Sequence, residues 1–403
     1  MNIGIIREGK VPPDFRVALT PKQCKHISDE YEHVKVFIQR SPIRTFEDKE
    51  YENLGLTLVD SLEHCDVIIG VKEVNIEDLI PNKSYMFFSH TFKKQSYNRK
   101  LLQTILEKRI RLIDYEVIKN VKGIRLIGFG RYAGIVGCYN GFRTYGLKHK
   151  LYDLKPANQC ADRKEVESEL KKVILPDNFK LVLTGFGRVG HGAREITKLL
   201  PIKEVDPKDF VSNSFNEPVF TQLEVEHYFD KTDNGEFIRK EFYTKPGLFK
   251  QGFQKYLSHT DMYIACHYWN SNSPKIITQQ DLASESNRIS VIADISCDIA
   301  DPIASTLRPS KISNPIYGYN PVTGEEEDFT KEGVVAVMAV DNLPCELPKD
   351  ASEDFGSELI KHVLPSLIGE DTDRIIERAS QTNLQGELMP AFEYLNDYLQ
   401  GRE

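Results

Sequence analysis

Short apolar runs alternate with charged, helix-like segments through the first third of this sequence. This alternation constrains the fold more than any other feature. The apolar runs are rich in β-branched or aromatic residues. They lie at 2–8, 35–39, 66–73, 84–90 and 110–118. The segments between them, such as 21–31 and 94–109, have helical spacing and charged faces. Strands that alternate with helices predict an α/β fold on a parallel, doubly wound sheet.

Length and charge narrow the class of protein. A chain of 403 residues is longer than a single hydrophobic core ordinarily supports, so two domains are expected. A formal charge of −8 argues against a nucleic-acid partner, which attracts a basic face. The N-terminal apolar run is too short for a signal peptide, and no run reaches the ~18 residues of a membrane helix. Seven cysteines without CxxC spacing indicate neither disulfides nor a zinc site, so we expect a cytoplasmic protein without a metal.

A second α/β unit begins after a long helical stretch at 130–150 that is lined with small residues. An apolar run at 181–184 starts this unit, and strand-like runs at 262–268 and 289–298 continue it. Such a repeat of strand and helix signals predicts a second doubly wound sheet.

The domain boundaries follow from these patterns. Residues 211–249 are polar and aromatic-rich without clear periodicity, and we interpret them as an insertion in the second unit. Helical stretches near the C-terminus are expected to return to the first unit. The sequence therefore predicts a discontinuous N-terminal domain, 1–132 plus 345–403, and a dinucleotide-binding domain, 133–344. The predicted fold is two Rossmann-like doubly wound domains with a cleft between them.

The residues after the run at 181–184 have the spacing of a dinucleotide-binding loop. Gly185, Gly187 and Gly190 form a GxGxxG between an apolar run and an amphipathic helix, where a pyrophosphate approaches the helix N-terminus closely. An acid about 20 residues further on should end the second strand and bind the ribose hydroxyls, and Asp206 has this spacing. Because a carboxylate repels a 2′-phosphate, Asp206 favours NAD over NADP, while Lys208 weakens the preference. A structural turn is the alternative interpretation of the loop.

Ionisable side chains follow three successive apolar runs of the first unit. Lys72 and Glu73 end one run, His90 ends the next, and Glu116 lies in the third. Ligands of open parallel sheets lie beyond the carboxyl ends of the strands, so we expect these side chains there. A single polar residue at a strand end is ordinary, but Lys and His at successive strand ends favour catalysis. Arg16 alone would more often be a surface charge.

The second unit offers further candidates at strand ends. Ser296 and Asp298 follow one apolar run, Asp341 and Asn342 follow another, and Tyr268 ends a third. Each could contact a nicotinamide dinucleotide or a substrate, and each could equally belong to a polar turn.

Nine motifs occur in the order of a known family. They are RVALTP, IIGVKE, FFSHTFKKQ, RLIDYE, GFGRYAG, the glycine loop, DISCD, NPIYGY and VDNLPCELPKDAS. With them the chain resembles the saccharopine dehydrogenase family, within the broader alanine dehydrogenase/transhydrogenase-like group. Segments around the glycine loop resemble the lysine–2-oxoglutarate reductase half of bifunctional enzymes, whereas the length resembles the stand-alone, lysine-forming enzyme.

The resemblance implies an oxidoreductase of lysine metabolism that interconverts saccharopine, water and NAD(P) with L-lysine, 2-oxoglutarate and NAD(P)H. It implies Lys72 as general base and His90 as its acid–base partner, with Glu73 and Glu116 tuning the pair. Substrate binding is implied for Arg16, Gln95, Arg125, Phe129, Ser296 and Asp298. Cofactor binding is implied for Gly185, Gly187, Arg188, Gly190, Asp206, Tyr268, Asp341 and Asn342.

The residue types suit this chemistry. Saccharopine carries three carboxylates, which arginine pairs with bidentately. A lysine with a lowered pKa can deprotonate its secondary amine, and a histidine can exchange protons near neutrality. Two alternatives stay open: an alanine dehydrogenase-like reductive amination by the same Lys/His pair, and a catalytically silent NAD-binding protein. NADP also stays possible, since the reductases of the family tend to use it, and the oligomeric state is not predicted.

Overall fold

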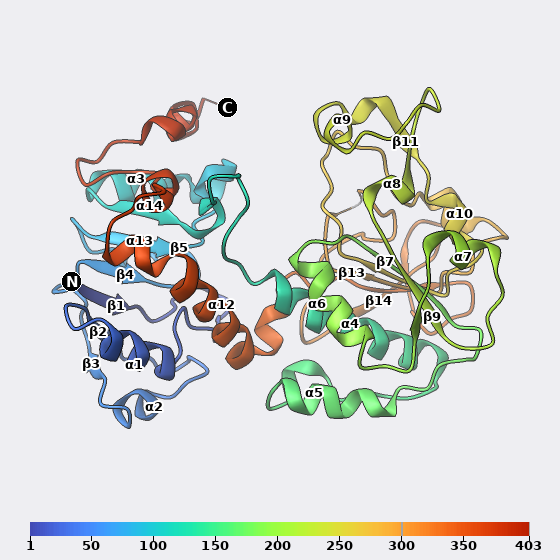
Figure 1. Cartoon of the computed structure of the whole chain (residues 1–403), viewed down its shortest axis with the longest axis horizontal. Coiled ribbons are helices and arrows are strands. Elements are labelled where there is room, and N and C mark those ends of the chain that lie inside the picture. The colour runs from blue at the N-terminus through green and yellow to red at the C-terminus, as the bar shows by residue number, and fades with distance from the viewer. Residues whose placement is uncertain (300, 403) are drawn as a thin grey trace. The chain divides into compact units, whose positions relative to one another are not determined.

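The computed structural model describes residues 1–299 and 301–402, and these form two compact α/β units. Unit 1 is Met1–Phe129 with Pro348–Glu403, and unit 2 is Gly130–Leu347. The C-terminal segment, red in Figure 1, lies among the blue and cyan elements of the N-terminal part. Unit 1 is therefore built from both ends of the chain, with boundaries that the sequence places at 132/133 and 344/345.

Unit 1 contains a parallel sheet in the order β3-β2-β1-β4-β5-β6. Its strands are β1 (Asn2–Ile5), β2 (Lys35–Gln39), β3 (Thr57–Val59), β4 (Val67–Ile69), β5 (Ser84–Phe87) and β6 (Arg111–Asp114). The chain adds β2 and β3 on one side of β1 and β4 to β6 on the other, which is a doubly wound order. The predicted α/β fold class is thus confirmed.

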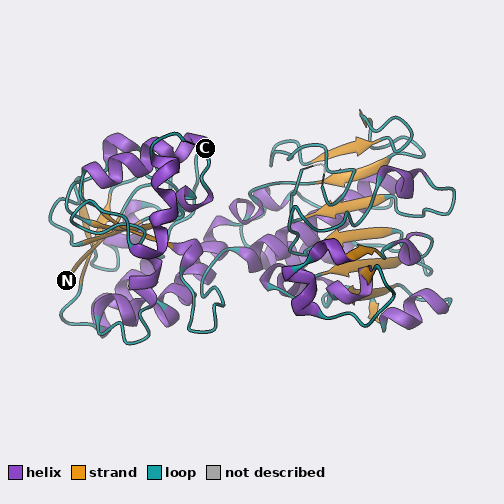
Figure 2. Ribbon diagram, turned by 90° about the horizontal axis from the view of Figure 1, so that it is seen from above, coloured by secondary structure: helices purple, strands orange, loops and turns teal. Residues whose placement is uncertain are grey.

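Helices lie on both sides of this sheet (Figure 2). They are α1 (Pro21–Glu30), α2 (Asp48–Glu52), α3 (Arg99–Glu107), α12 (Pro348–His362), α13 (Leu364–Ile368), α14 (Ile375–Ala379) and α15 (Asn396–Leu399). Thr20 is the N-cap of helix α1: its hydroxyl accepts a hydrogen bond from the backbone N–H of Gln23, and Pro21 is the first residue of the helix. This is the Thr-Pro helix start that follows Arg16 in the sequence.

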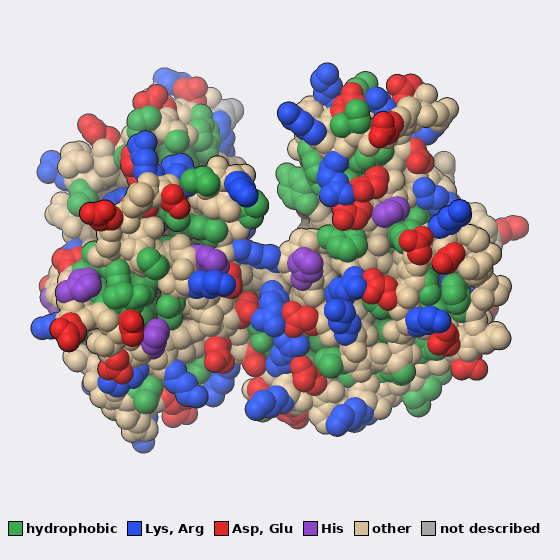
Figure 3. All heavy atoms as spheres, viewed as in Figure 1, with side chains coloured by type: hydrophobic (Ala, Val, Ile, Leu, Met, Phe, Trp, Pro, Cys, Tyr) green, Lys and Arg blue, Asp and Glu red, His purple; other side chains and the backbone are tan. Residues whose placement is uncertain are grey.

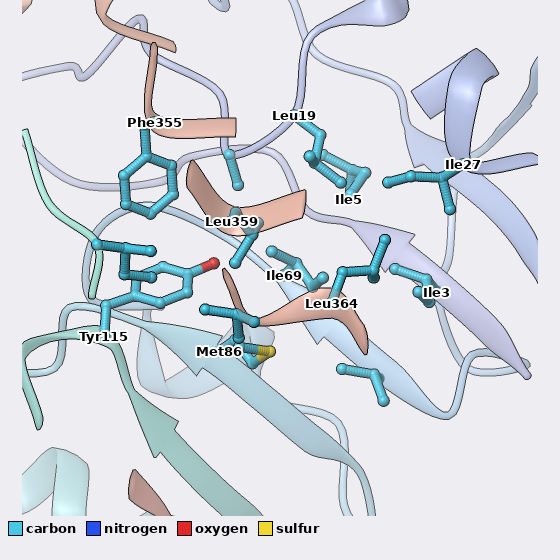
Figure 4. Close-up of a cluster of buried hydrophobic side chains, with 14 of the residues drawn as sticks. Ile3, Ile5, Leu19, Ile27, Ile69, Met86, Tyr115, Phe355, Leu359 and Leu364 are labelled. Carbon is cyan, nitrogen blue, oxygen red and sulfur yellow. The ribbon is translucent and has the colours of Figure 1, made fainter. Parts of the chain in front are cut away.

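The main apolar core of unit 1 packs the sheet against helices from both ends of the chain (Figure 4). Ile5, Ile69 and Met86 come from β1, β4 and β5, and Phe355 and Leu359 come from α12; all five are buried. Burial of each such side chain contributes about 1.5–3 kcal/mol. The C-terminal helices are therefore an integral part of the fold of unit 1.

Unit 2 contains an eight-stranded sheet in the order β15-β14-β16-β13-β12-β7-β9-β8. Its strands are β7 (Lys180–Thr184), β8 (Lys203–Glu204), β9 (Val219–Leu223), β12 (Met262–Ala265), β13 (Val291–Asp294), β14 (Ile316–Tyr319), β15 (Glu326–Glu327) and β16 (Val335–Met338). The pairs of β14 with β15 and β16 are antiparallel, and the other neighbours are parallel. Strands β10 (Phe229–Lys231) and β11 (Phe249–Gln251) form a separate antiparallel pair.

One strand of unit 2 lies inside the segment that the sequence predicts to be an insertion. The prediction covers 211–249, but β9 lies in the main sheet between β7 and β8. Thr221 and Gln222 interrupt the apolar pattern of β9 although both are buried, so its periodicity did not mark it as a core strand. The insertion prediction is wrong for this strand, and the excursion from the sheet runs from Val225 to β11.

The longest helix of unit 2 is α4 (Gly130–His149), with 20 residues. The others are α5 (Arg163–Glu169), α6 (Arg188–Thr197), α7 (Pro207–Ser212), α8 (Val225–Tyr228), α9 (Arg239–Thr244), α10 (Gln254–Leu257) and α11 (Gln279–Ala283). The long helix α4 crosses α6 with the two backbones in contact. A Cβ on Gly192 of α6 would lie 1.9 Å from the carbonyl oxygen of Arg131, and a Cβ on Gly134 of α4 would lie 1.9 Å from that of Val189.

We expect Gly192→Ala to destabilise unit 2, because its methyl group would overlap a backbone carbonyl that cannot rotate away. Overpacking of a tight core typically costs about 1–3 kcal/mol, and a backbone clash belongs at the upper end. Gly247→Ala is the matched control, since a Cβ at Gly247 meets no atom within 4 Å. Urea unfolding of both variants measures the difference. Equal midpoints for the two variants would contradict the helix crossing.

Acidic and basic side chains are interspersed on the face of each unit that Figure 3 shows. On this face of the described chain there is no continuous basic area of the kind that attracts nucleic acid. Among the residues that the structure describes, no helix is both long enough and apolar enough to span a membrane.

Candidate active site

The ionisable residues that the sequence predicts in unit 1 follow three neighbouring parallel strands. Lys72 and Glu73 come after β4, His90 comes after β5, and Glu116 lies in the 3-10 helix Tyr115–Val117 after β6. Since β4, β5 and β6 are adjacent and parallel, their carboxyl ends meet at one edge of the sheet. The structure brings these side chains together there.

His90 forms a close pair with Glu73. The imidazole Nδ1 lies 2.6 Å from Glu73 Oε1, and Lys10 Nζ donates to the other carboxylate oxygen at 2.6 Å. Burial raises the pKa of Glu73, but the hydrogen bonds from His90 and Lys10 outweigh it and lower the pKa to about 2. An ionised Glu73 can only accept a hydrogen bond, so Nδ1 carries the proton and Nε2 is the nitrogen left for proton transfer.

Glu116 approaches the other side of the imidazole. Its Oε2 lies 3.8 Å from His90 Nε2, and its Oε1 lies 2.8 Å from Lys93 Nζ and 3.7 Å from Arg125 NH1. Two cations and the imidazole thus surround one half-buried carboxylate. This arrangement keeps a negative charge beside His90, which stabilises an imidazolium whenever one forms.

The backbone of Lys72 is fixed by Glu8. The buried Glu8 carboxylate accepts hydrogen bonds from the backbone N–H of Val71 at 2.7 Å and of Lys72 at 2.9 Å. Burial lowers the pKa of the Lys72 amine, and the charge of Arg16 lowers it further. A lower pKa increases the neutral fraction of the amine, and only the neutral amine can act as a general base.

Arg16 lies beside Lys72 and pairs with Asp14. Its Nε and NH2 donate to the two Asp14 oxygens at 3.0 and 2.6 Å, and both side chains are only 3% exposed. Burial raises the pKa of Asp14, but the charge and hydrogen bonds of Arg16 outweigh it and lower the pKa to about 2. The guanidinium carbon also lies 4.1 Å from the centre of the Phe129 ring. Asp14 and Phe129 therefore fix the orientation of Arg16.

A buried carboxylate holds the loop that carries His90. Asp114 accepts hydrogen bonds from the Ser89 hydroxyl, from the Ser89 backbone N–H at 2.9 Å and from the Glu116 backbone N–H at 2.7 Å. Gln381, from the C-terminal segment, donates to the same carboxylate at 3.3 Å. Between these anchors His90 adopts a left-handed backbone conformation, with φ of 54°. Such a conformation is unfavourable for a residue with a side chain, so the surrounding hydrogen bonds maintain it.

The other predicted substrate residues of unit 1 differ in their surroundings. Phe129 stacks on Phe355, with ring centres 4.4 Å apart and nearly parallel planes. Arg125 reaches Glu116, as described above, and its Nε donates to a backbone carbonyl at 2.9 Å. Gln95 is exposed, and its side-chain oxygen accepts a hydrogen bond from Tyr97. The structure thus brings Arg125 and Phe129 to the site and leaves Gln95 on a neighbouring exposed loop.

The glycine loop of unit 2 connects β7 to α6. Two of its three glycines have no space for a side chain. A Cβ on Gly190 would lie 2.1 Å from the Gly185 carbonyl oxygen, and Gly185 itself has φ of +90°. Gly187 is the N-cap of α6, and a Cβ there would meet no atom within 4 Å. Arg188 is the first residue of the helix. Open space before a ten-residue helix N-terminus fits a pyrophosphate, which the backbone N–H groups and helix dipole attract.

The strand order corrects the reasoning that selected Asp206. The strand beside β7 is β9, whereas β8 lies at the sheet edge and Asp206 is an exposed residue that caps α7 through the Lys208 N–H. The prediction took β8, the next strand along the chain, as the neighbour of β7. In the sheet this neighbour is β9. The acid that follows β9 is Glu224. The position expected of a ribose-binding acid therefore belongs to Glu224.

The remaining predicted residues of unit 2 follow strands on the other side of β7. Tyr268 follows β12 and is 74% exposed, Ser296 and Asp298 follow β13, and Asp341 and Asn342 follow β16. These strands are parallel to β7 in the order β16-β13-β12-β7. All five residues therefore lie at the same sheet edge as the glycine loop.

Ser296 and Asp298 lie around a second buried carboxylate. Asp294 Oδ1 accepts hydrogen bonds from the backbone N–H of Ser296 at 3.0 Å and from its hydroxyl at 2.6 Å. Burial, together with the charge of Asp294, raises the pKa of Asp298 to about 6. Asp294 thus orders the loop after β13, as Asp114 orders the loop after β5 in unit 1.

Several charged residues of the unit 1 site were not predicted from the sequence. They are Glu8, Lys10, Asp14 and Lys93. Asp14 lies two residues before Arg16, so a search for opposite charges near each predicted ion would have found it. Lys93 is close to His90 in the sequence but pairs with Glu116, 23 residues further on. Glu8 and Lys10 act across the sheet, where the sequence carries no comparable signal.

Known proteins resemble this chain along most of its length. Residues 4–136 match the family described as alanine dehydrogenase/PNT, N-terminal domain. Alpha-aminoadipic semialdehyde synthase of Arabidopsis thaliana is 30% identical over 98% of this chain. Saccharopine dehydrogenase (NAD(+), L-lysine-forming) of Yarrowia lipolytica is 26% identical, with 90% of each chain covered. The predicted resemblance to the saccharopine dehydrogenase family is confirmed.

Two solved structures share the fold. An L-alanine dehydrogenase superposes with a TM-score of 0.65 at 18% identity, covering 99% of this chain and all of the other. A transhydrogenase from Sinorhizobium meliloti has a TM-score of 0.58 at 12% identity, covering 97% of this chain and all of the other. The chain spans only 41% of the Arabidopsis relative and 47% of the Bos taurus protein of the same name.

Proposed function

We propose that this chain is an NAD(P)-dependent saccharopine dehydrogenase, which interconverts saccharopine, water and oxidised dinucleotide with L-lysine, 2-oxoglutarate and reduced dinucleotide. The observation that carries the proposal is the grouping of Lys72, Glu73 and His90 at adjacent strand ends. There a lysine with a lowered pKa lies beside a hydrogen-bonded imidazole–carboxylate pair. The similarity to saccharopine dehydrogenases over 90% of the chain supports the substrate class.

In this proposal Lys72 removes a proton from the secondary amine of saccharopine. Transfer of hydride from the carbon next to the nitrogen requires the nitrogen lone pair, so the amine has to be neutral. When bound, a nicotinamide dinucleotide supplies the hydride acceptor. Lys72 suits the role of base because burial and the charge of Arg16 both favour its neutral form.

His90 exchanges protons with water during hydrolysis of the imine. Glu73 holds the Nδ1 proton, so the lone pair of a neutral imidazole is on Nε2. Nε2 can take a proton from the attacking water and later return one to the departing amine of lysine. Glu116, 3.8 Å from Nε2, stabilises the imidazolium formed between these two steps.

Arginines hold the carboxylates of the substrate. Arg16 and Arg125 flank the Lys72–His90 group, and arginine binds carboxylates with two parallel hydrogen bonds. Unit 2 holds the dinucleotide, with its pyrophosphate at Gly187 and its nicotinamide end at the loops after β13 and β16. The open space before α6 supports this assignment.

The proposed function is tested by following oxidation of NADH and NADPH in the presence of L-lysine and 2-oxoglutarate together. Turnover that requires both substrates is expected. A parallel assay with pyruvate and ammonia tests the alanine dehydrogenase-like alternative, which the shared fold keeps relevant. Turnover in the assay with pyruvate and ammonia, but not in the assay with L-lysine and 2-oxoglutarate, would overturn the proposed substrate. Cofactor binding without turnover in either assay would indicate a silent binding protein.

We expect Arg125→Ala to raise the KM for 2-oxoglutarate roughly 10-fold or more, because one charge-assisted hydrogen bond is worth about 1.5–3 kcal/mol. Arg125 is 37% exposed, so its removal should leave the fold intact. Lys122→Ala removes an exposed cation from the same loop and is the matched control. Steady-state kinetics with either substrate varied measure the effect. A change confined to dinucleotide affinity would contradict the assignment.

A further inference from the structure

The two residues before Glu224 hydrogen-bond directly to the first glycine of the loop. The backbone N–H of Gly185 donates to the Leu223 carbonyl at 3.0 Å, and the Gln222 amide donates to the Gly185 carbonyl at 2.8 Å. Glu224 is therefore the first residue beyond β9, level with the start of the loop. In doubly wound sheets the acid at this position binds the adenosine ribose of a dinucleotide.

The segment that leaves the sheet after β9 returns an arginine to this acid. Arg239, at the start of α9, forms an ion pair with Glu224, and its NH2 also lies 2.7 and 2.9 Å from the two oxygens of Glu226. The three side chains are 31%, 34% and 49% exposed for Glu224, Glu226 and Arg239. Two carboxylates and one guanidinium leave one net negative charge at a site that solvent and a ligand can reach.

Aromatic side chains border the same place. A cavity of about 300 Å³ is lined by Phe242, Tyr243, Tyr268, Asn270 and Ser273. Burial raises the pKa of Tyr243, and the charges of Arg239, Glu224 and Glu226 all act on its phenol. Helix α9 thus presents Arg239 and Tyr243 together, facing Tyr268 from the loop after β12. Aromatic walls beside a polar group suit a purine ring that carries a ribose.

We infer that the segment from Glu224 to Tyr243 builds the adenosine end of the dinucleotide site, and that Glu224, held in place by Arg239, selects a cofactor with a free 2′-hydroxyl. The inference rests on the proposed function, because it assumes that unit 2 binds a nicotinamide dinucleotide. Glu224 is then the residue that discriminates NADH from NADPH.

The selection follows from charge. A ribose 2′-hydroxyl can donate a hydrogen bond to the Glu224 carboxylate, which is oriented by its pair with Arg239. A 2′-phosphate would bring negative charge to a group that is already negative, although Arg239 can also bind phosphate. With Glu224 present, Arg239 is shared between two carboxylates, and the net negative charge of the three side chains favours binding of NADH over NADPH. Without Glu224, the guanidinium becomes available to a phosphate.

The test is a pair of binding titrations without substrates, so that it does not depend on turnover. NADH and NADPH are titrated separately against the full chain by calorimetry, with quenching of the single tryptophan, Trp269, as a second readout. Trp269 is adjacent to Tyr268. We expect Glu224→Gln to weaken NADH binding and tighten NADPH binding, changing the ratio of their dissociation constants on the order of 10- to 100-fold. Asp206→Asn makes the same change of charge at the exposed acid and should leave the ratio unaltered.

A second variant gives an independent check if Glu224→Gln does not fold. Arg239→Gln keeps Glu224 but removes the cation, so NADPH binding should weaken further relative to NADH. An unchanged ratio in both variants, or a larger change in Asp206→Asn than in Glu224→Gln, would overturn the inference while leaving the proposed function intact. A wild-type chain that binds neither dinucleotide would overturn the proposed function and this inference together.

Discussion

Lys72→Met should slow the oxidation of saccharopine by roughly 10²–10⁴-fold, the contribution typical of a general base. Methionine has a similar length and cannot accept a proton. Glu8 holds residue 72 by its backbone, so the loop should keep its conformation in the variant. Steady-state and single-turnover kinetics measure the loss, and circular dichroism together with NADH titration checks the fold and unit 2.

The pH profile gives a second readout of the same residue. The pKa of Lys72 lies below 10.5, since burial and Arg16 disfavour the charged amine. As pH rises through this lowered pKa, Lys72 becomes neutral, so kcat/KM for saccharopine oxidation should rise with pH until the amine is fully deprotonated. In Lys72→Met this limb should disappear. Lys83→Met, at the amino end of β5, is the control and should retain it. Activity within a few-fold of wild type in Lys72→Met would refute the role.

Much of the fold was predictable because strand and helix patterns are local. The runs at 2–8, 66–73 and 84–90 each contain a strand that the structure confirms, β1, β4 and β5. β9 was missed because its buried Thr221 and Gln222 interrupt the apolar pattern of the strand. The Gln222 amide serves internal hydrogen bonds, since it accepts from Arg194 and donates to the Gly185 carbonyl. Such polar residues in a central strand are invisible to a hydrophobicity pattern.

The order of strands in a sheet is harder to predict from the sequence than the presence of each strand. The spacing from the glycine loop to Asp206 matched the expected distance to a ribose-binding acid, yet β8 joins the sheet at its edge and β9 takes the place beside β7. Spacing along the chain carries no information about which strand pairs with which. The order of the strands along the chain was sufficient to predict the grouping of Lys72 with His90, because β4 and β5 are consecutive in the sequence and adjacent in the sheet.

His90→Gln is expected to impair the steps that add and remove water at the imine, by roughly 10²–10⁴-fold in steady-state turnover. The glutamine amide can still donate a hydrogen bond to Glu73, so the loop held by Asp114 should persist, but the amide cannot transfer protons near neutral pH. Single-turnover formation of reduced dinucleotide should be less affected than release of L-lysine. His64→Gln, an exposed histidine on the amino side of β4, is the control. Equal losses in both phases would place His90 in the hydride step instead.

The double variant Lys72→Met, His90→Gln tests whether the two groups work as a unit. Both lie in one network, since Glu73 bonds to His90 and its charge also acts on the Lys72 amine. Groups that share protons lose most of their joint contribution when either is removed. The fold-loss of rate in the double variant should therefore be much smaller than the product of the two single fold-losses. Losses that multiply fully would mean that Lys72 and His90 act in separate steps with no proton passing between them, and that the contact through Glu73 serves only to orient the imidazole.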